Sequence, residues 1–310
     1  FLSGGVDSSL NVALMAEQLN RPVETFSIGI EGDDKNEFEY ARLVAQRFGA
    51  NHHEIMINDE DFISFLPRMA WYQDEPLSDP VCVPLYYLSK LARDSGVPVI
   101  QVGEGSDEIF AGYTVYRQFY QWNRYGYSPY LGLPKVLRKF IYQTMHRMMP
   151  APIEDALRRA AQNQVFFIGN TVAFWDCEKT GLLRGFPEVE ASSAYIDRLT
   201  NDLDLNDDLS RLTSVELTNR LPELLLMRVD KMSMAHSLET RVPFLDEDLV
   251  EFALRIPTDL KFRNGITKYI LKKAAEGIIP RESIYRRKQG FCGSATSILS
   301  PRLKAYAYEC

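Results

Sequence analysis

The sequence predicts an α/β fold, a parallel sheet with flanking helices, followed by a mostly helical C-terminal half. Short apolar runs rich in β-formers alternate with amphipathic stretches over residues 1–112, and this alternation is typical of βαβ units. Strand signals fade over residues 113–310, where helical periodicity prevails. No internal repeat or low-complexity linker divides the chain, so we expect one domain, with a core over 1–112 and a helical part over 113–310.

Each element of the core follows from its apolar period and its flanking residues. Asp7 or Ser8 is able to cap the first helix, and Gly49 is able to end the second one in a left-handed conformation. Right-handed crossovers make such strands parallel, so their carboxyl ends share one edge of the sheet. The expected strands are the one that ends at Phe1-Leu2 and those at 23–30, 52–57 and 97–102; the expected helices are 8–19, 37–48, 85–93, 153–164 and 209–227.

The composition argues against several functional classes. The 35 basic and 42 acidic side chains leave a net charge of −7, whereas affinity for nucleic-acid backbones is carried by Lys and Arg. The four cysteines form no C-x-x-C pair, so we expect neither a disulfide framework nor a structural zinc site, and a reducing cytoplasm is the simplest setting. No apolar run reaches the ~18 residues of a membrane helix. We therefore expect a cytoplasmic protein without a nucleic-acid or membrane partner.

A glycine-rich loop, residues 3–9 (SGGVDSS), separates the first strand from the first helix. Its glycines let the backbone approach an anion, and its amides and hydroxyls lie at the positive end of a helix dipole. The Lys-Ser/Thr pair of a Walker A loop is absent. The loop resembles that of the ATP pyrophosphatases (PP-loop family), which grips pyrophosphate, and in that resemblance Asp7 holds Mg²⁺. The alternative is an ordinary glycine turn with a helix cap.

A second loop, residues 103–108 (GEGSDE), directly follows the strand at 97–102. Three carboxylates at the end of a buried strand are costly without a metal or a substrate. Ligands of open α/β sheets bind at the carboxyl ends of strands, so the two loops are expected to share one site. Asp107 is the natural second Mg²⁺ ligand, and Glu104 is a candidate base or charge stabiliser for an attacking amine. A solvated turn is the alternative.

Four blocks together resemble, in order, the synthetase domain of glutamine-dependent asparagine synthetases. They are residues 3–9, 103–113 (GEGSDEIFAGY), 221–246 (LPELLLMRVDKMSMAHSLETRVPFLD) and 265–291, which contains GITKYILKKA and RRKQGF. The resemblance implies a PP-loop fold of the adenine nucleotide alpha-hydrolase type. It also implies a ligase that activates a carboxylate with Mg²⁺ and ATP as an acyl-adenylate, releases pyrophosphate, and forms an amide with ammonia. Residues 113–209 match no motif.

The resemblance also implies roles for single residues. Lys288 stabilises the adenylation transition state, unless it belongs to a solvated basic face, and Gly290-Phe291 after it favour a mobile lid. Leu2 and Ile28 fall where the family contacts adenine and ribose, with plain sheet packing as the alternative. The residues implied to bind ATP or pyrophosphate are Leu2, Ser3, Gly4, Gly5, Asp7, Ser8, Ile28, Gly103 and Lys268.

Three further expectations concern the surroundings of the site. Lys268 approaches phosphate or lies on a helix surface. Glu239, Arg241 and Asp246 are expected to form a buried ion network under the pocket. Residues 74–80 (DEPLSDP) depart from the Thr- and Arg-bearing version of bacterial asparagine synthetases, so the carboxylate remains open between aspartate and the substrate of an amidotransferase or β-lactam-type synthetase. A non-catalytic scaffold is a further alternative, disfavoured because Asp7, Glu104, Asp107 and Lys288 are all present.

The family's glutaminase domain uses an N-terminal cysteine, and none stands here: Phe1 is first and Cys82 is internal. We therefore expect ammonia to come from outside or from a glutaminase domain, upstream in a longer chain or separate. Phe1 itself reads as a cut within the first strand. The sequence leaves a homodimer open.

Overall fold

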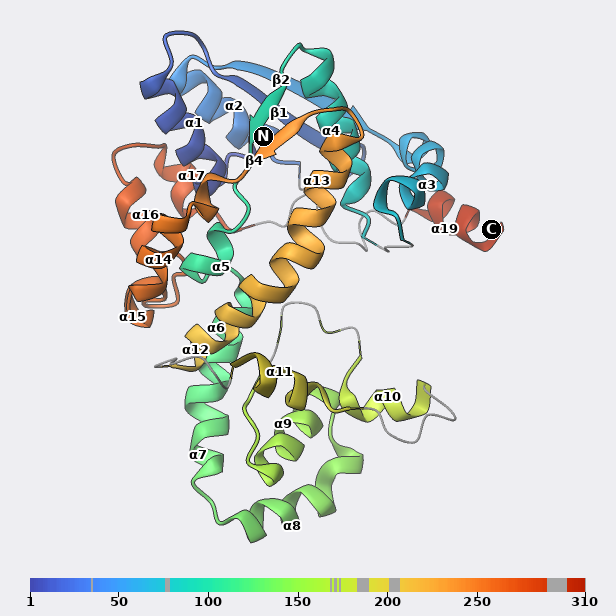
Figure 1. Cartoon of the computed structure of the whole chain (residues 1–310), viewed down its shortest axis with the longest axis vertical. Helices are drawn as coiled ribbons and strands as arrows, with labels where there is room; N and C mark the ends of the chain where they lie inside the picture. The colour runs from blue at the N-terminus through green and yellow to red at the C-terminus, as the bar shows by residue number, and fades with distance from the viewer. Residues whose placement is uncertain are drawn as a thin grey trace. The chain divides into compact units, whose positions relative to one another are not determined.

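The computed structural model divides the chain into two compact units, each described by itself (Figure 1). It describes residues 1–34, 36–75, 79–167, 169, 172, 174–182, 190–200, 207–288 and 300–309. Unit 1 comprises Phe1–Ser106, Pro222–Glu251 and Ile270–Cys310, and unit 2 comprises Asp107–Leu221 and Phe252–Tyr269.

Unit 1 contains a parallel sheet. Its named strands are β1 (Glu24–Ile30), β2 (Asn51–Ile57), β3 (Val99–Gln101) and β4 (Glu239–Arg241). Strand β1 pairs in parallel with β2 and β3 pairs in parallel with β4. The backbone of Phe1 and Leu2 joins the two pairs, because Leu2 N–H donates to the Phe26 carbonyl at 2.9 Å and the Phe1 nitrogen donates to the Gln101 carbonyl at 2.7 Å. The two two-stranded parallel sheets are thus bridged in the order β2, β1, residues 1–2, β3, β4, and the expected parallel pairing of the strands is confirmed.

Helices cover both faces of this sheet (Figure 1). On one face, Leu2 packs with Val12, Ala41 and Val44 from α1 (Val6–Gln18) and α2 (Phe38–Phe48). On the other face, the side chains of β1 and β3 pack in one cluster with those of three helices. These helices are α3 (Asp59–Gln73), α4 (Cys82–Asp94) and α13 (Met227–Met234). The remaining helices with residues in unit 1 are α5 (Ser106–Phe110), α14 (Glu247–Arg255), α16 (Tyr269–Ala275), α17 (Arg281–Tyr285) and α19 (Pro301–Glu309).

Unit 2 is built from helices, and its described residues contain no named strand. Its core gathers aromatic and leucine side chains, among them Phe119 and Phe166, whose rings stack at 5.3 Å. The helices are α6 (Thr114–Trp122), α7 (Ser128–Leu131), α8 (Lys135–Met145), α9 (Ala151–Gln162), α10 (Asp176–Leu182), α11 (Ser192–Thr200), α12 (Asp208–Val215) and α15 (Thr258–Lys261). A π-helical segment, Asn123–Tyr127, and a 3₁₀ turn, His146–Met148, continue them, as do residues 216–221 of a second π-helical segment, Glu216–Leu226.

The structure confirms most expected elements and corrects some. Gly49 ends α2 with φ 61°, as expected. The expected cap on α1 is wrong: the helix begins at Val6 with Gly5 at the N-cap position, and no side chain caps it. The expected helix at 209–227 continues through a π-helical segment into α13. The sequence analysis missed α3 and β4.

The boundary of the units differs from a simple division after residue 112. The chain first leaves unit 1 after Ser106, close to the expected division. Residues 222–251 and 270–310 then return to unit 1. Residues 222–251 return because β4 extends the sheet beside β3 and α13 packs against α4. Residues 270–310 return because α17 packs against α1 and α2, and α19 packs against α3.

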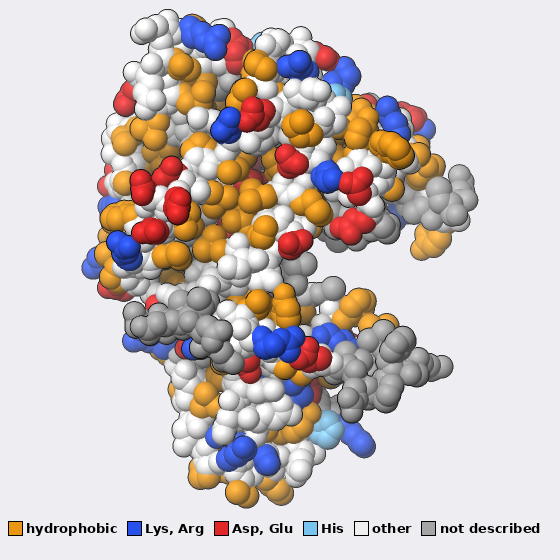
Figure 2. Space-filling model, in the orientation of Figure 1, with side chains coloured by type: hydrophobic (Ala, Val, Ile, Leu, Met, Phe, Trp, Pro, Cys, Tyr) orange, Lys and Arg blue, Asp and Glu red, His pale blue; other side chains and the backbone are white. Residues whose placement is uncertain are grey.

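Charged side chains of both signs are scattered over the face shown in Figure 2, with hydrophobic side chains between them. Among the described residues, no helix is both long enough and apolar enough to cross a membrane.

Candidate active site

The two loops singled out by sequence follow neighbouring strand segments at the carboxyl edge of the sheet in unit 1. Residues 1–2 lie between β1 and β3, and the chain first adds strands on one side of them and later on the other. Where strand order reverses in this way, the loops after the two neighbouring strands diverge and leave room for a ligand. These are the two loops singled out by sequence, the phosphate loop (residues 3–9) after Leu2 and the acidic loop (residues 103–108) after β3.

The phosphate loop requires glycine at its second position. Gly4 has φ 72°, and a Cβ there would lie 2.4 Å from the backbone carbonyl carbon of Tyr40 in α2. The hydroxyls of Ser3 and Ser8 lie 3.1 Å apart, and Ser3 N–H donates to Ser8 Oγ at 3.2 Å. The loop is therefore held by its own side chains and by close contact with α2.

The first turn of α1 follows directly from this loop. Gly5 occupies the N-cap position and, having no side chain, caps none of the first amides of α1 within the described segment 1–34. Uncapped N–H groups at the positive end of a helix of 13 residues can bind an anion. The absent cap, which contradicts the expected role of Asp7 or Ser8, therefore favours an anion site.

Asp7 contacts the acidic loop. Ser106 Oγ donates to Asp7 Oδ1 at 2.7 Å. A Cβ on Gly103 would lie 3.0 Å from the Cβ of Asp7, so the missing side chain at Gly103 permits this approach. The structure thus brings the two sequence-predicted loops together within unit 1.

Glu104 lies at the turn of the acidic loop, between two glycines, and is half-buried. Gly105 has φ 87°, and a Cβ there would lie 2.2 Å from Leu245 Cδ2. The turn therefore needs glycine both for its backbone conformation and for its packing. The proposed role of Glu104 as a base or charge stabiliser stays a prediction.

Asp107, the residue after Ser106, is paired with Lys268 inside unit 2. Lys268 Nζ lies 2.8 Å from Asp107 Oδ1, and Lys268 is 2% exposed. The alternative that Lys268 lies on a helix surface is wrong, because this residue has φ 52° and precedes α16. A Cβ on Gly112 would lie 1.9 Å from Asp107 Oδ1. The pair therefore occupies a space that only glycine leaves open.

Glu108, the third carboxylate of the acidic loop, has its charged partners within unit 2. The Tyr113 hydroxyl donates to Glu108 Oε1 at 2.9 Å, and Arg220 Nη1 lies 3.5 Å from the same oxygen. Arg220 also lies 5.0 Å above the Tyr113 ring. The expectation that all three carboxylates need a metal or substrate is thus wrong for Glu108, which is 1% exposed and neutralised by protein.

Asp7 and Asp107 are the two carboxylates expected to bind magnesium. Among the described residues, no three His, Cys, Asp or Glu side chains gather as they would around a metal. Mg²⁺ is commonly held by one or two carboxylates together with water and substrate phosphates, not by a cage of protein ligands. Each of Asp7 and Asp107 carries the type of oxygen ligand that such a site uses, and their role in binding Mg²⁺ stays a prediction.

The predicted adenine contacts are both buried in unit 1. Leu2 is 2% exposed and packs under α1 and α2, whereas Ile28 is 9% exposed and packs in the cluster on the opposite face. Both side chains contribute to sheet packing, which was the alternative. Contact with adenine or ribose stays a prediction for both residues.

Lys288 is exposed and lies shortly after α17. The structure ties this segment to the phosphate loop through Arg286, which donates to the Ser3 carbonyl at 3.3 Å and forms a buried ion pair with Glu37. Sequence analysis missed this pair, since Glu37 carries no motif signal. Gly290 and Phe291, the predicted lid, lie outside the described residues.

The expected buried network of Glu239, Arg241 and Asp246 is wrong. Arg241 Nη2 does lie 2.7 Å from Glu239 Oε1, but the two side chains are 67% and 54% exposed. Asp246 is also exposed and accepts a hydrogen bond from Leu249 N–H at 3.3 Å. The pair is exposed because β4 is the last strand of the sheet, and Asp246 supports the start of α14.

The segment expected to shape the carboxylate side of the site is anchored on α13. Arg228 Nη1 lies 2.5 Å from Asp79 Oδ2, and Lys231 pairs with Asp74. Residues 76–78 lie outside the described residues. The ends of the segment are thus attached to one helix of unit 1.

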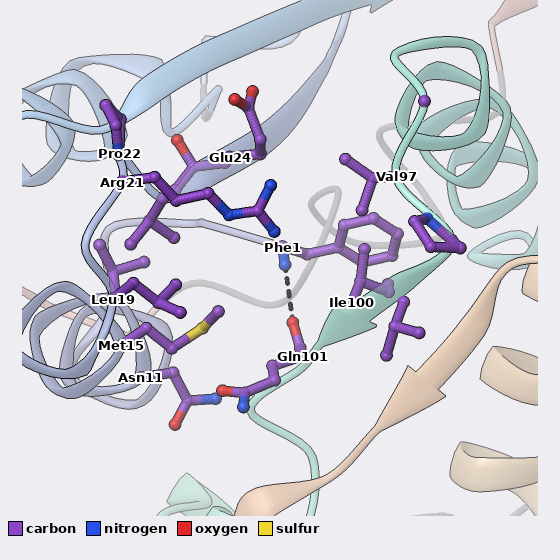
Figure 3. Close-up of a pocket in the computed structure, with 16 residues that line it drawn as sticks. Phe1, Asn11, Met15, Leu19, Arg21, Pro22, Glu24, Val97, Ile100 and Gln101 are labelled. Carbon is purple, nitrogen blue, oxygen red and sulfur yellow. Dashed lines mark hydrogen bonds between the residues drawn. The ribbon is translucent and has the colours of Figure 1, made fainter.

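A separate cavity of about 330 Å³ lies at the opposite, amino-terminal edge of the sheet (Figure 3). It is lined by Phe1 and lies between the start of β1 and the stretch leading into β3, with α1 alongside. Its lining includes Asn11, Met15, Leu19, Arg21, Val97 and Ile100. Because it lies away from both glycine-rich loops, it is not part of the candidate active site.

Comparison with known proteins identifies the family. The family model described as asparagine synthase matches residues 1–310. "Asparagine synthetase [glutamine-hydrolyzing] 1" of Bacillus subtilis is 35% identical over 297 residues, which cover 94% of this chain and 45% of that protein. A putative asparagine synthetase of Mycobacterium tuberculosis is 33% identical over 294 residues (94% and 44%), and the asparagine synthetase of Bos taurus is 27% identical over 308 residues (96% and 39%). The chain thus spans less than half the length of these relatives. It belongs to the asparagine synthase family.

Proposed function

We propose that this chain is the ATP-dependent synthetase part of an asparagine synthetase, built on a PP-loop fold of the adenine nucleotide alpha-hydrolase type. The observation that carries the proposal is the contact between the phosphate loop and the acidic loop, made by Ser106 and Asp7 at the point where strand order reverses. The names of the relatives support asparagine as the product.

The proposed reaction has two steps. The side-chain carboxylate of aspartate attacks the α-phosphate of ATP, forming an acyl-adenylate and releasing pyrophosphate. Ammonia then attacks the acyl carbon, and asparagine and AMP leave. Such a site must hold the carboxylate in line and stabilise charge on the phosphate oxygens.

The phosphate loop and α1 supply donors for pyrophosphate. Amides and hydroxyls of residues 3–8 bind its oxygens, with Gly4 and Gly5 allowing close approach. Asp7 and Asp107 hold Mg²⁺, which neutralises charge on the phosphates when bound. Since Lys268 already contacts Asp107 at 2.8 Å, it contributes positive charge beside that carboxylate.

The acyl-transfer chemistry falls to two further residues. Lys288 carries its ammonium group to the α-phosphate and stabilises the charge that develops during adenylation. Glu104, at the glycine-flanked turn of the acidic loop, takes a proton from the attacking ammonia or stabilises its positive charge. Gly103 keeps the nucleotide side of this loop open.

The remaining parts of the proposal concern the whole protein. Glutamine is the source of ammonia, through a glutaminase domain upstream or on a separate chain, as the names of the relatives suggest for those proteins. We further propose a cytoplasmic location and leave a homodimer as a matter for measurement. The departure at residues 74–80 keeps a different carboxylate substrate as the second candidate, in an amidotransferase or β-lactam-type synthetase.

Pyrophosphate–ATP exchange with a panel of carboxylates, followed by addition of ammonia, tests the proposal. We expect exchange that depends on aspartate, and asparagine as the product when ammonia is present. Exchange with another acid alone would select the second candidate. A folded protein that catalyses no exchange with any acid would contradict both.

A further inference from the structure

Arg286 joins three parts of unit 1 that lie far apart in the sequence. Its Nη2 donates to the carbonyl oxygen of Ser3, in the phosphate loop, at 3.3 Å. The same nitrogen pairs with Glu37, the residue before α2. The side chains of Arg286 and Glu37 are only 9% and 15% exposed, so this pair differs from an ordinary surface salt bridge.

Two residues at the start of α2, Glu37 and Tyr40, contact Arg286. The guanidinium carbon of Arg286 lies 4.7 Å from the ring centroid of Tyr40, and the backbone of Tyr40 is what a Cβ on Gly4 would strike. A planar guanidinium can stack on a ring while it donates hydrogen bonds in its own plane. Arg286 is therefore fixed by α2 at the place where α2 touches the phosphate loop.

We propose that Arg286 and Glu37 are positioning residues, which fix the phosphate loop and hold the Lys288 segment beside it. This inference deepens the proposed function and rests on it for its catalytic part. Lys288 is two residues beyond Arg286, and two residues span at most about 7 Å. Fixing Arg286 thus confines the backbone of Lys288 to the neighbourhood of the loop, although Lys288 itself is exposed.

The charge of the pair makes its two members interdependent. Burial raises the pKa of Glu37 above its usual value, and the positive charges of Arg286 and Lys288 oppose this shift only in part. Removing the arginine would leave a buried carboxylate without its main partner, which costs more than the pair contributes. The two substitutions should therefore be non-additive, because the second removes the charge that the first left uncompensated.

The test compares Glu37→Gln, Arg286→Met and the double variant in the whole protein that contains this chain. Hydrogen exchange, read by mass spectrometry on peptides that span residues 3–9, reports the loop without any need for activity. We expect amide exchange there to become at least about ten-fold faster in each single variant. This factor corresponds to the stability that is lost with one hydrogen bond to a charged group. Arg287→Met is the matched control, because Arg287 is the exposed neighbour of Arg286.

Pyrophosphate–ATP exchange gives the catalytic readout. We expect kcat to fall at least about ten-fold in each single variant, with the KM for the carboxylate little changed, and the double variant to lose less than the product of the single losses. Arg286→Lys should recover only part of the loss, because lysine keeps the charge but not the planar fork. Arg286→Lys also replaces Arg286→Met in both measurements if the methionine variant does not fold.

Unchanged loop exchange in folded Arg286→Met or Arg286→Lys would overturn the inference, as would equal effects for Arg287→Met. A wild-type protein without any pyrophosphate exchange would overturn the proposed function instead. The hydrogen-exchange comparison would still decide whether Arg286 fixes the loop.

Discussion

Replacement of Gly4 by alanine tests the packing of the phosphate loop most directly. Gly4 combines φ 72° with close contact, since a Cβ would lie 2.4 Å from the carbonyl carbon of Tyr40 and 2.7 Å from the backbone nitrogen of Ala41. Gly49, at the other end of the same helix α2, has φ 61° and nothing within 4 Å of such a Cβ. Gly49→Ala is therefore a matched control, which carries the backbone strain without the collision.

The difference between the two variants can be estimated. A left-handed alanine costs about 1–2 kcal/mol at either position. At Gly4 the contacts are with backbone atoms, so the loop or α2 must shift, and overpacking of this kind costs a further ~1–3 kcal/mol. We expect the free energy of unfolding to fall by about 1–2 kcal/mol in Gly49→Ala and by about 2–5 kcal/mol in Gly4→Ala.

Urea denaturation and pyrophosphate–ATP exchange together measure the effect. If the loop moves away to relieve the collision, stability is partly spared, but a displacement of about 1 Å at the site lowers the exchange rate by roughly 100-fold. Gly49→Ala should keep its exchange rate. Equal stability and equal exchange in the two variants would refute the reasoning that the loop is held against α2.

Three further predictions concern charged groups. Asp107→Ala should abolish pyrophosphate–ATP exchange while unfolding in urea stays cooperative; near-normal exchange would remove Asp107 from the metal site. Arg220→Met leaves Glu108 buried without its cation and should lower the free energy of unfolding by about 3–5 kcal/mol, a loss that Glu108→Gln in the same chain should partly restore. Burial lowers the pKa of Lys261 to about 8, with Asp207 opposing the shift. Since the unfolded side chain titrates near 10.5, the unfolded state binds more protons between these values, and stability should rise with pH from about 8 to 10.5. Lys261→Met should be more stable than wild type at pH 7 by up to about 3 kcal/mol, with a difference that shrinks across that window; a constant difference would contradict the shift.

Local patterns were sufficient for most of unit 1. The alternation of apolar runs and amphipathic stretches predicted β1, β2 and β3 and the helices α1, α2 and α4, although not α3, because each period matches one secondary structure. Strand β4 escaped detection because it is three residues long and polar on both faces, with only Thr240 half-buried. It is a strand only because β3 offers an edge to pair with.

The candidate site divides in the same way. The phosphate loop and the acidic loop were visible as glycines and carboxylates at strand ends, and parallel topology alone brings strand ends together. The N-cap of α1 was misassigned because Asp7, a good capping residue by type, is turned to the Ser106 hydroxyl. Its role depends on a neighbour almost a hundred residues away.

The amino-acid sequence by itself determined which chemical groups the two loops offer, since glycine, serine, aspartate and lysine in short motifs limit what a loop can bind. Only the tertiary structure decided which charges are used inside the protein. Glu108 is neutralised by Arg220, Lys268 lies beside Asp107, and Arg286 pairs with Glu37. These partners are set by burial, because a charge removed from water must find its counter-ion in space, whatever the distance along the chain.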